Sequence, residues 1–292
     1  MMMHRFNRPV YPRWQTAFTD EALRRAWLKV RANNGTSGPD GQTVADFERD
    51  LDAQLRSLQQ ELIEGRYKPR RVTQVLVPKA SSGWRPLSLW AIRDRVVQRA
   101  VYNYLEPVVE PRFLACSYGF RPGRTTKDAA LAIHQARLGG ADWVFDGDIK
   151  DCFGQMKREI LQKQLGRWGV PGPLRELIDR WLRAHVWNAW RGDGQAGTSQ
   201  GGAISPLLCN IYLHEFDEQL RHRRWRLIRY ADDFVIVGRS QREAERAGRR
   251  AGDILAKLGL EIHPQKSRIT SFAEGFQFVG WFFINEQIHE LR

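Results

Sequence analysis

Two adjacent acidic residues interrupt an otherwise apolar stretch of this chain. The sequence LIRYADDFVIVG (227–238) places Asp232 and Asp233 between two short apolar runs, which predicts a hairpin of buried strands. A third acid, Asp148, ends a similar apolar run within VFDGDI (144–149). Carboxylates in such surroundings are costly unless a positive charge compensates them. An isolated Asp-Asp pair is usually a turn motif, but core strands on both sides of this pair favour a cation site.

Magnesium is the cation that best fits these three carboxylates. It prefers oxygen ligands and is usually bound by few carboxylates together with substrate phosphates. Two such ions stabilise the attacking and the leaving oxygen of an in-line phosphoryl transfer. The sequence therefore predicts two Mg²⁺ ions, which Mn²⁺ would be able to replace, at a phosphoryl-transfer site.

Composition points to the same class of substrate. The 292 residues carry a net charge of +13, with a pI of about 10.1, and the excess is spread along the chain. Such a balance suits nucleic-acid binding, although a generally basic protein without such a partner has the same composition. We find no membrane span and no signal peptide. Three widely spaced cysteines form no zinc or disulfide pattern, so we expect a cytoplasmic protein.

The periodicity of apolar residues predicts a mixture of helices and hairpins. Hairpins are expected at 72–89 and 227–237, and single strands at 143–149 and 276–283. Loops are expected at 33–41, 118–123 and 192–202. Helices are expected from Thr19, along the stripe 47–62, and at 93–106, 125–137, 159–168, 173–187, 205–220 and 241–258. This mixture favours the α+β class.

Eight blocks of the sequence resemble the reverse transcriptases of group II introns, in the order of that family. They are NNGTSGPDG (33–41), VLVPKASSGWRPLSLWAIRDRVVQRAV (75–101), YGFRPGRTTKDAA (118–130), DIKDCF (148–153), GTSQGGAISPLLCNIYLHEFD (197–217), YADD (230–233), LGLEIHPQKSRI (258–269) and FQFVGWFF (276–283).

The resemblance implies the fingers and palm of a right-hand polymerase, with an antiparallel palm sheet backed by helices. It implies an N-terminal helical extension of the fingers over 1–50, fingers over 51–140 and a palm over 141–292. The activity it implies is RNA-directed DNA synthesis from deoxynucleotides, with an RNA template and a DNA or RNA primer as partners.

The resemblance also carries roles over to particular residues. Catalysis would use Asp148, Asp232, Asp233 and Lys266, and the metal ligands would be Asp148, Asp232, Asp233 and the carbonyl of Ile149. The residues implied to bind the nucleotide are Lys79, Arg85, Asp151, Cys152, Phe153, Gln200 and Gly201. Those implied to contact the primer are Phe278, Val279 and Gly280. Without the family, Phe153 reads as a core residue and Lys266 as a surface lysine.

The chain departs from the family pattern in three places. Gly154 and Lys157 stand where the family typically has Asp and His, and Ser199 replaces the commoner Pro. The sequence ends directly after the last palm block, so we expect no thumb, maturase domain or endonuclease. Either the protein is naturally minimal, or the chain is a fragment, or a partner protein supplies the thumb or the grip on the duplex.

Several functional alternatives stay open at this point. They are an RNA-directed RNA polymerase, a fragment of a group II intron enzyme, and a non-catalytic RNA-binding protein of the maturase type. We expect a biological role in phage defence or CRISPR spacer acquisition.

Overall fold

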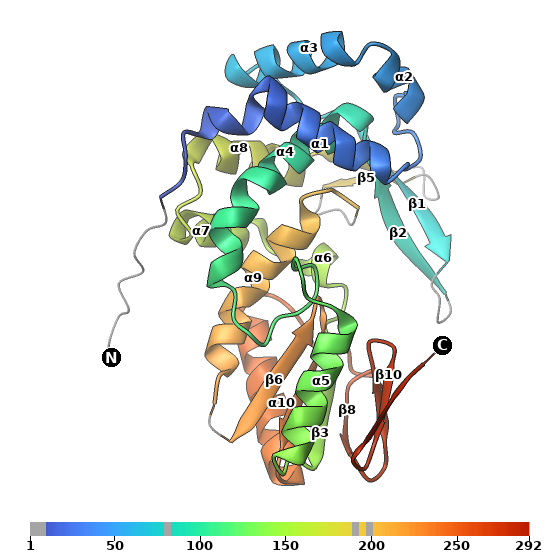
Figure 1. Cartoon of the computed structure of the whole chain (residues 1–292), viewed down its shortest axis with the longest axis vertical. Coiled ribbons are helices and arrows are strands. Elements are labelled where there is room, and N and C mark those ends of the chain that lie inside the picture. Colours follow the sequence, from blue (N-terminus) through green and yellow to red (C-terminus); the bar gives the residue numbers. More distant parts are fainter. Residues whose placement is uncertain (1–9, 79–82, 189–192, 197–200, 223, 292) are drawn as a thin grey trace. The chain divides into compact units, whose positions relative to one another are not determined.

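The chain forms two compact units, each built from two segments of sequence. A computed structural model describes residues 10–78, 83–188, 193–196, 201–222 and 224–291, with the backbone alone for 185–188 and 193–196 (Figure 1). Unit 1 comprises Met1–Pro111 and Arg158–Leu208, and unit 2 comprises Arg112–Lys157 and Cys209–Arg292. The predicted boundaries at 50 and 140 follow functional subdomains of the family and stay a prediction.

Unit 1 is a helical body with one mixed sheet. The strands follow the order β2-β1-β4-β5, in which β1 and β4 are parallel and the other pairs antiparallel. Its elements are η1 (Trp14–Phe18), α1 (Asp20–Ala32), α2 (Val44–Arg49), α3 (Leu51–Ile63), β1 (Val72–Pro78), β2 (Trp84–Leu89), α4 (Ile92–Val109), α7 (Arg158–Arg167), α8 (Gly172–Leu182), β4 (His185–Asn188) and β5 (Asp193–Ala196). The turn η2 (Glu110–Arg112) follows α4 directly.

Unit 2 contains a four-stranded antiparallel sheet of order β6-β7-β3-β8, and a small sheet of order β11-β10-β9. Its elements are α5 (Thr126–Leu138), β3 (Trp143–Asp148), α6 (Cys152–Gln155), β6 (Trp225–Tyr230), β7 (Asp233–Gly238), α10 (Gln241–Lys257), β8 (Arg268–Ser271), β9 (Phe276–Phe278), β10 (Trp281–Ile284) and β11 (Gln287–Glu290). Helix α9 (Ser205–Leu220) begins in unit 1 and runs mostly through unit 2.

Side chains alternate between the two faces of the larger sheet, because successive strand residues point in opposite directions. On one face, Val144 and Val235 join a buried cluster with Ile133 of α5 and Phe276 of β9. On the other face, the ring of Phe145 packs against α10. Figure 1 shows α5 and α10 beside this sheet. Helices therefore back the antiparallel sheet, as the fold prediction requires.

Most predicted elements are present, with corrections at several boundaries. The predicted helix over 173–187 is wrong beyond Leu182, since β4 follows it, and the predicted loop over 192–202 contains strand β5. The helix predicted along residues 47–62 is divided at Asp50 into α2 and α3. The strand predicted over 276–283 is instead a hairpin of β9 and β10. Among the described residues, no helix has the length and apolar character needed to cross a bilayer.

Candidate active site

The register of the larger sheet brings the first and last of the three key acids face to face. Strands β3 and β7 are antiparallel, and their register sets Asp148 directly opposite Asp233. Side chains of opposed residues lie on the same face of a sheet, with Cβ atoms about 4.5–5.5 Å apart. Asp232 precedes β7 at the hairpin turn, where its carbonyl accepts a hydrogen bond of 3.3 Å from the backbone N–H of Ile149. Asp148 and the Asp232–Asp233 pair, 84 and 85 positions apart in sequence, therefore lie at the same end of two adjacent central strands.

The crowding of these acids changes their protonation. Removal of water around the carboxyl, together with the charges of Asp232 and Asp148, raises the pKa of Asp233 to about 7. Burial, aided by the charge of Asp148, also raises the pKa of Asp232. Lys266 opposes this repulsion, because its Nζ lies 2.9 Å from an Oδ of Asp148, and Arg229 also lowers the pKa of Asp232. The cluster keeps an excess of negative charge.

A fourth acid, Asp146, belongs to the same face and was missed by the sequence analysis. Residues two apart on a strand share a face, so the spacing in VFDGDI was an available signal. Burial raises the pKa of Asp146 to about 6, while Arg268, opposite it on β8, lowers this value through an ion pair of 3.7 Å. Asp146 adds a further negative charge beside Asp148.

The acids fit a divalent cation that substrate phosphates help to coordinate. Among the described residues, no three His, Cys, Asp or Glu side chains form a group that would hold a metal by itself. Magnesium commonly needs no such group, because water and substrate phosphates complete its coordination. Carboxylate oxygens are hard donors, and the ends of β3 and β7 carry an excess of negative charge. Both features suit such an ion.

The hairpin between β6 and β7 has a strained tip that a buried network supports. Ala231 has a φ of +59°, a backbone conformation uncommon for residues with a side chain. Its carbonyl accepts a hydrogen bond of 2.8 Å from the guanidinium of Arg229. Arg229 is fully buried and also donates to both carboxylate oxygens of Asp217, to Asn210 and to Ser117. The sequence analysis assigned none of these four residues a role.

A glycine lets a neighbouring loop pack against the same tip. A Cβ on Gly119 would lie 2.3 Å from the backbone nitrogen of Ala231, closer than real contacts allow. The side-chain amide of Asn210 donates to the carbonyl of Gly119 over 2.9 Å and holds the loop there. The block YGFRPG therefore supports the acids through its backbone.

The segment after β3 places three predicted nucleotide-binding residues. Asp151 has a left-handed φ of +42° and is the N-cap residue of α6. A Cβ on Gly154 would lie 2.2 Å from the carboxylate of Asp151. There is no room for a side chain at this position, where the family typically has Asp, so glycine suits the local packing. Cys152 is fully buried, and Phe153 is buried with 9% of its surface exposed.

The residues predicted to contact the primer lie at the turn between β9 and β10. Val279 and Gly280 both have positive φ, +42° and +86°, which makes this turn tight. Phe278 is buried in the apolar cluster of unit 2, and Val279 packs against that cluster. All three belong to the same unit as the acids.

The remaining predicted residues belong to unit 1 or lie outside the described residues. Arg85 is an exposed residue of β2. Gly201 has a φ of +111°, and a Cβ there would lie 2.7 Å from the carbonyl oxygen of Ser88. Lys79 and Gln200 lie outside the described residues.

Comparison with known proteins gives one consistent family. The family model described as "Reverse transcriptase (RNA-dependent DNA polymerase)" matches residues 77–283. Protein YkfC of Escherichia coli K12 is 31% identical over 286 residues, covering 84% of this chain and 75% of YkfC. The group II intron-encoded protein LtrA of Lactococcus lactis is 30% identical over 254 residues, covering 84% of this chain and 42% of LtrA.

Solved structures agree with this relationship. A chain of a partial Cas6-RT-Cas1–Cas2 complex is 25% identical, with a TM-score of 0.50, and the match covers 83% of this chain and 41% of the other. Telomerase from Candida albicans, at 14% identity and a TM-score of 0.57, shares the fold. The chain therefore belongs to the reverse transcriptase family of RNA-directed DNA polymerases, and to its group II intron-like members.

Proposed function

We propose that Asp148, Asp232 and Asp233 would hold two Mg²⁺ ions, and that a primer 3′-hydroxyl displaces pyrophosphate from the α-phosphate of a deoxynucleotide paired to an RNA template. The register that opposes Asp148 to Asp233 beside Asp232 carries this proposal. Bound there, divalent ions would stabilise charge on the attacking and the leaving oxygen. The carbonyl of Ile149 is proposed as a further ligand, because its N–H already bonds to the backbone of Asp232.

Lys266 is proposed to donate a proton to the pyrophosphate leaving group. Its ammonium, 2.9 Å from Asp148, is half exposed and therefore accessible to a substrate. Lys266→Arg would keep the positive charge but donate a proton poorly, because the pKa of arginine is above 12. A general acid predicts that kcat falls in Lys266→Arg and that the alkaline limb of the pH–rate profile moves. A role in positioning Asp148 alone predicts that arginine preserves both.

The other predicted residues are proposed to form the nucleotide and primer sites. Backbone N–H groups at Asp151 and Cys152 would bind the triphosphate, with Lys79 and Arg85 closing on it and Gln200 and Gly201 against the nucleotide. The residues proposed to support the primer end are Phe278, Val279 and Gly280.

Phe153 is proposed to select deoxynucleotides, because its ring would clash with a 2′-hydroxyl. Phe153 keeps 9% of its surface exposed. We expect Phe153→Ala to raise the ratio of ribonucleotide to deoxynucleotide kcat/KM by about tenfold or more. Because both kcat/KM values come from the same variant, a loss of folded protein lowers both equally and leaves the ratio unaffected. An unchanged ratio would show that Phe153 does not select deoxynucleotides.

The carboxylate proposal is tested by primer extension on an RNA template. Asp232→Asn should abolish synthesis, because the amide cannot supply the negative charge that holds the ion, while binding of primer–template is retained. Asp253→Asn, at an exposed position of α10, is the matched control and should leave synthesis unchanged. Full activity of Asp232→Asn would refute the site, and an inactive wild-type protein that still binds RNA would favour the maturase-like alternative.

The biological role is proposed from the solved relatives. The likeness to a chain in a Cas6-RT-Cas1–Cas2 complex supports a role in CRISPR spacer acquisition, with a partner protein that grips the duplex. The likeness to LtrA supports a retroelement origin. Sequencing the RNA that co-purifies with the protein separates them, since CRISPR-derived transcripts favour the first role and intron RNA the second.

A further inference from the structure

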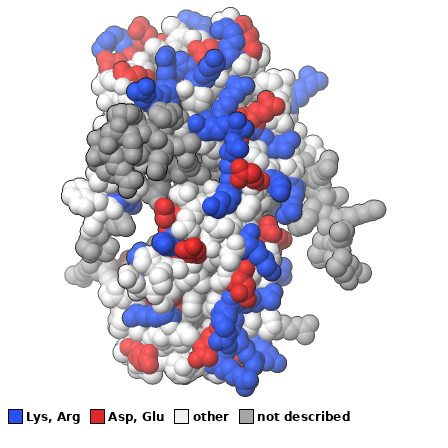
Figure 2. All heavy atoms as spheres, turned by 180° about the vertical axis from the view of Figure 1, so that it is seen from behind, with Lys and Arg blue, Asp and Glu red and all other residues white. Residues whose placement is uncertain are grey.

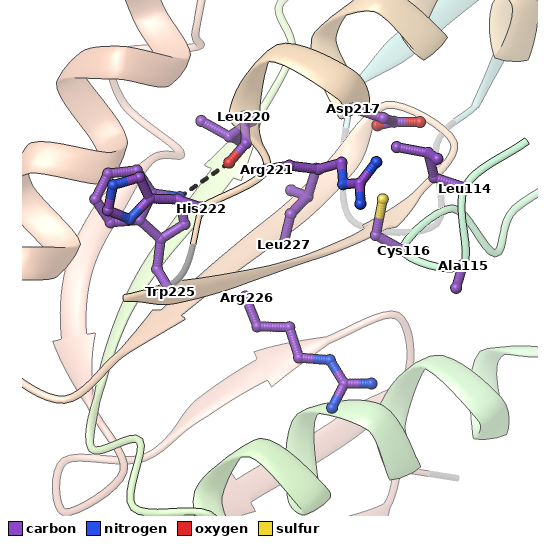
Figure 3. Close-up of a pocket in the computed structure, with 10 residues that line it drawn as sticks. All are labelled: Leu114, Ala115, Cys116, Asp217, Leu220, Arg221, His222, Trp225, Arg226 and Leu227. Atoms are coloured by element: carbon purple, nitrogen blue, oxygen red, sulfur yellow. Dashed lines mark hydrogen bonds between the residues drawn. The ribbon is translucent and has the colours of Figure 1, made fainter. Parts of the chain in front are cut away.

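A pocket of about 640 Å³ opens at one edge of the larger sheet of unit 2 (Figure 3). Its volume lies within the range that holds small organic ligands, about 300–1,000 Å³. None of the residues that line it was predicted to bind nucleotide, metal or primer. Leu227, in its wall, is five residues before Asp232, which corresponds to roughly 17 Å along an extended strand. The pocket is therefore distinct from the candidate active site.

The pocket forms where a neighbouring segment separates from an edge strand. Strand β6 is at the edge of its sheet. Arg229 is covered there, since its N–H donates to Cys116 and its carbonyl accepts from Tyr118, each over 2.8 Å. Before Arg229, the segment that precedes Cys116 separates from β6. The space between this segment and β6 is lined by apolar side chains that include Leu114 and Leu227.

Positive charge surrounds this apolar space. Arg221 and Arg226 line the pocket, Arg224 lies between them in sequence, and all three are exposed. Among the described residues, none of these three arginines has a carboxylate at salt-bridge distance. Figure 3 shows Arg226 on one side of β6 and Arg221 on the other. Arg221 is near enough to Glu218 to help lower the pKa of that carboxyl, but it makes no direct ion pair with it, so the three guanidinium groups are available to an external anion.

The interior of the pocket adds no free negative charge. Burial raises the pKa of Cys116 to about 12, so its thiol is neutral. The carboxylate of Asp217 is fully buried and paired with Arg229. The pocket thus combines an uncharged interior with cationic side chains around it.

A stacked pair of rings stands at one end of the pocket. The rings of His222 and Trp225 lie 4.0 Å apart at an angle of 17°. The indole N–H of Trp225 donates to the carbonyl of Leu220 over 3.0 Å, which fixes the stack (Figure 3). His222 is exposed, so the stack can be reached from solvent.

From this combination we infer that the pocket binds single-stranded nucleic acid outside the polymerase site, with a base against the His222–Trp225 stack and phosphates on Arg221 and Arg226. Aromatic platforms and arginines are the groups that bind unpaired bases and their backbone. The bound strand would be either the RNA template beyond the copied region or the single-stranded DNA product. The inference does not depend on the three carboxylates.

The test measures binding of fluorescein-labelled ten-nucleotide oligo(U) and oligo(dT) while an unlabelled primer–template hairpin saturates the polymerase site. The double variant Arg221→Ala/Arg226→Ala should bind the labelled strand at least about tenfold more weakly. The slope of log affinity against log salt should fall by roughly 1.4, since each lost phosphate contact on a single strand contributes about 0.7. His222→Ala should weaken binding without changing this slope. Tighter binding of oligo(U) would identify the bound strand as the RNA template, and tighter binding of oligo(dT) would identify it as the DNA product.

The matched control is Arg242→Ala/Arg246→Ala, which removes the same charge from exposed positions of α10. It should leave both the affinity and the slope unchanged, and all variants should keep the wild-type unfolding temperature and extension of a short primer–template. An equal loss in both doubles would overturn the inference, as would displacement of the labelled strand by the hairpin. Binding of an acidic peptide in place of both oligonucleotides would make the pocket a peptide site instead.

Discussion

At the scale of single residues, the hairpin that carries two of the acids is supported by buried groups outside the proposed active site. The guanidinium of Arg229 joins the strained tip at Ala231 to Asp217 of α9, and all of its surface is buried. Removal of one partner from a buried ion pair leaves an uncompensated charge, which is more damaging than the loss of the whole pair. The stability of the tip therefore depends on both members.

We expect Arg229→Met to lower the free energy of unfolding by about 3–5 kcal/mol, measured by urea denaturation. Arg226→Met, an exposed position on the same strand, should change it by less than about 0.5 kcal/mol. Adding Asp217→Leu to Arg229→Met should restore part of the lost stability, because no buried charge then remains unpaired. If the single and the double variant are equally unstable, the ion pair is not what supports the tip.

A second buried acid, Asp94, makes unit 1 sensitive to pH. Its carboxylate accepts hydrogen bonds from the hydroxyl of Tyr67 and the backbone N–H of Arg70. Burial nevertheless raises the pKa of Asp94 above its ordinary value of 3.8. A raised pKa in the folded state means that the folded protein binds the proton of Asp94 more tightly than the unfolded chain does. Protonation of Asp94 therefore stabilises the fold. This contribution to the free energy of unfolding is full below pH 3.8 and is lost as pH rises through the folded-state pKa.

The variant Asp94→Asn isolates this contribution. Relative to the variant, the wild-type unfolding free energy should fall as the pH rises from about 4 to 7, measured by urea denaturation at each pH. A difference between the two proteins that stays constant over this range would show that Asp94 keeps an ordinary pKa.

At the scale of elements, helix α10 is held close to the larger sheet by a glycine. A Cβ on Gly248 would lie 2.4 Å from the ring of Phe145 on β3. Gly252, one turn further along α10, has no comparable neighbour, since its Cβ would approach Ile262 at 3.7 Å. The same substitution in one helix should therefore have opposite effects at these two positions.

We expect Gly248→Ala to destabilise the protein by about 1–3 kcal/mol through overpacking. Gly252→Ala should stabilise it by about 0.5–1 kcal/mol, because alanine loses less conformational freedom in a helix. Chemical denaturation of both variants gives the comparison. Similar values for the two would mean that α10 does not depend on this close approach.

At the scale of the whole molecule, net charge is the property that acts on nucleic acid over distance. The chain carries +13, and Figure 2 shows Lys and Arg interspersed with Asp and Glu over the face that it draws. Spread-out positive charge attracts a polyanion through release of bound counterions, which makes binding depend on salt.

Affinity for a primer–template should therefore fall at least about tenfold between roughly 50 and 200 mM monovalent salt at constant Mg²⁺. Fluorescence anisotropy at several salt concentrations measures this slope. Binding that is independent of salt would show that the charge excess makes no contact with phosphates.

What the sequence determined by itself was local. The periodicity of LIRYADDFVIVG identified the hairpin and its acids, and the capping residue Thr19, whose hydroxyl accepts from the N–H of Ala22, marked where the first long helix begins. The blocks in family order identified a reverse transcriptase. These features depend on neighbours within a few positions along the chain, so a pattern of residue types is enough to reveal them.

Tertiary structure alone decided which distant residues meet. Strand β4 pairs with β1 across more than 100 residues and replaces the end of a predicted helix. Asp148 lies opposite Asp233 through sheet register, and Arg229 is buried because Asp217, Asn210 and Ser117 come from other segments to receive its hydrogen bonds. Burial and strand partners depend on contacts between remote parts of the chain, and local composition carries no record of them.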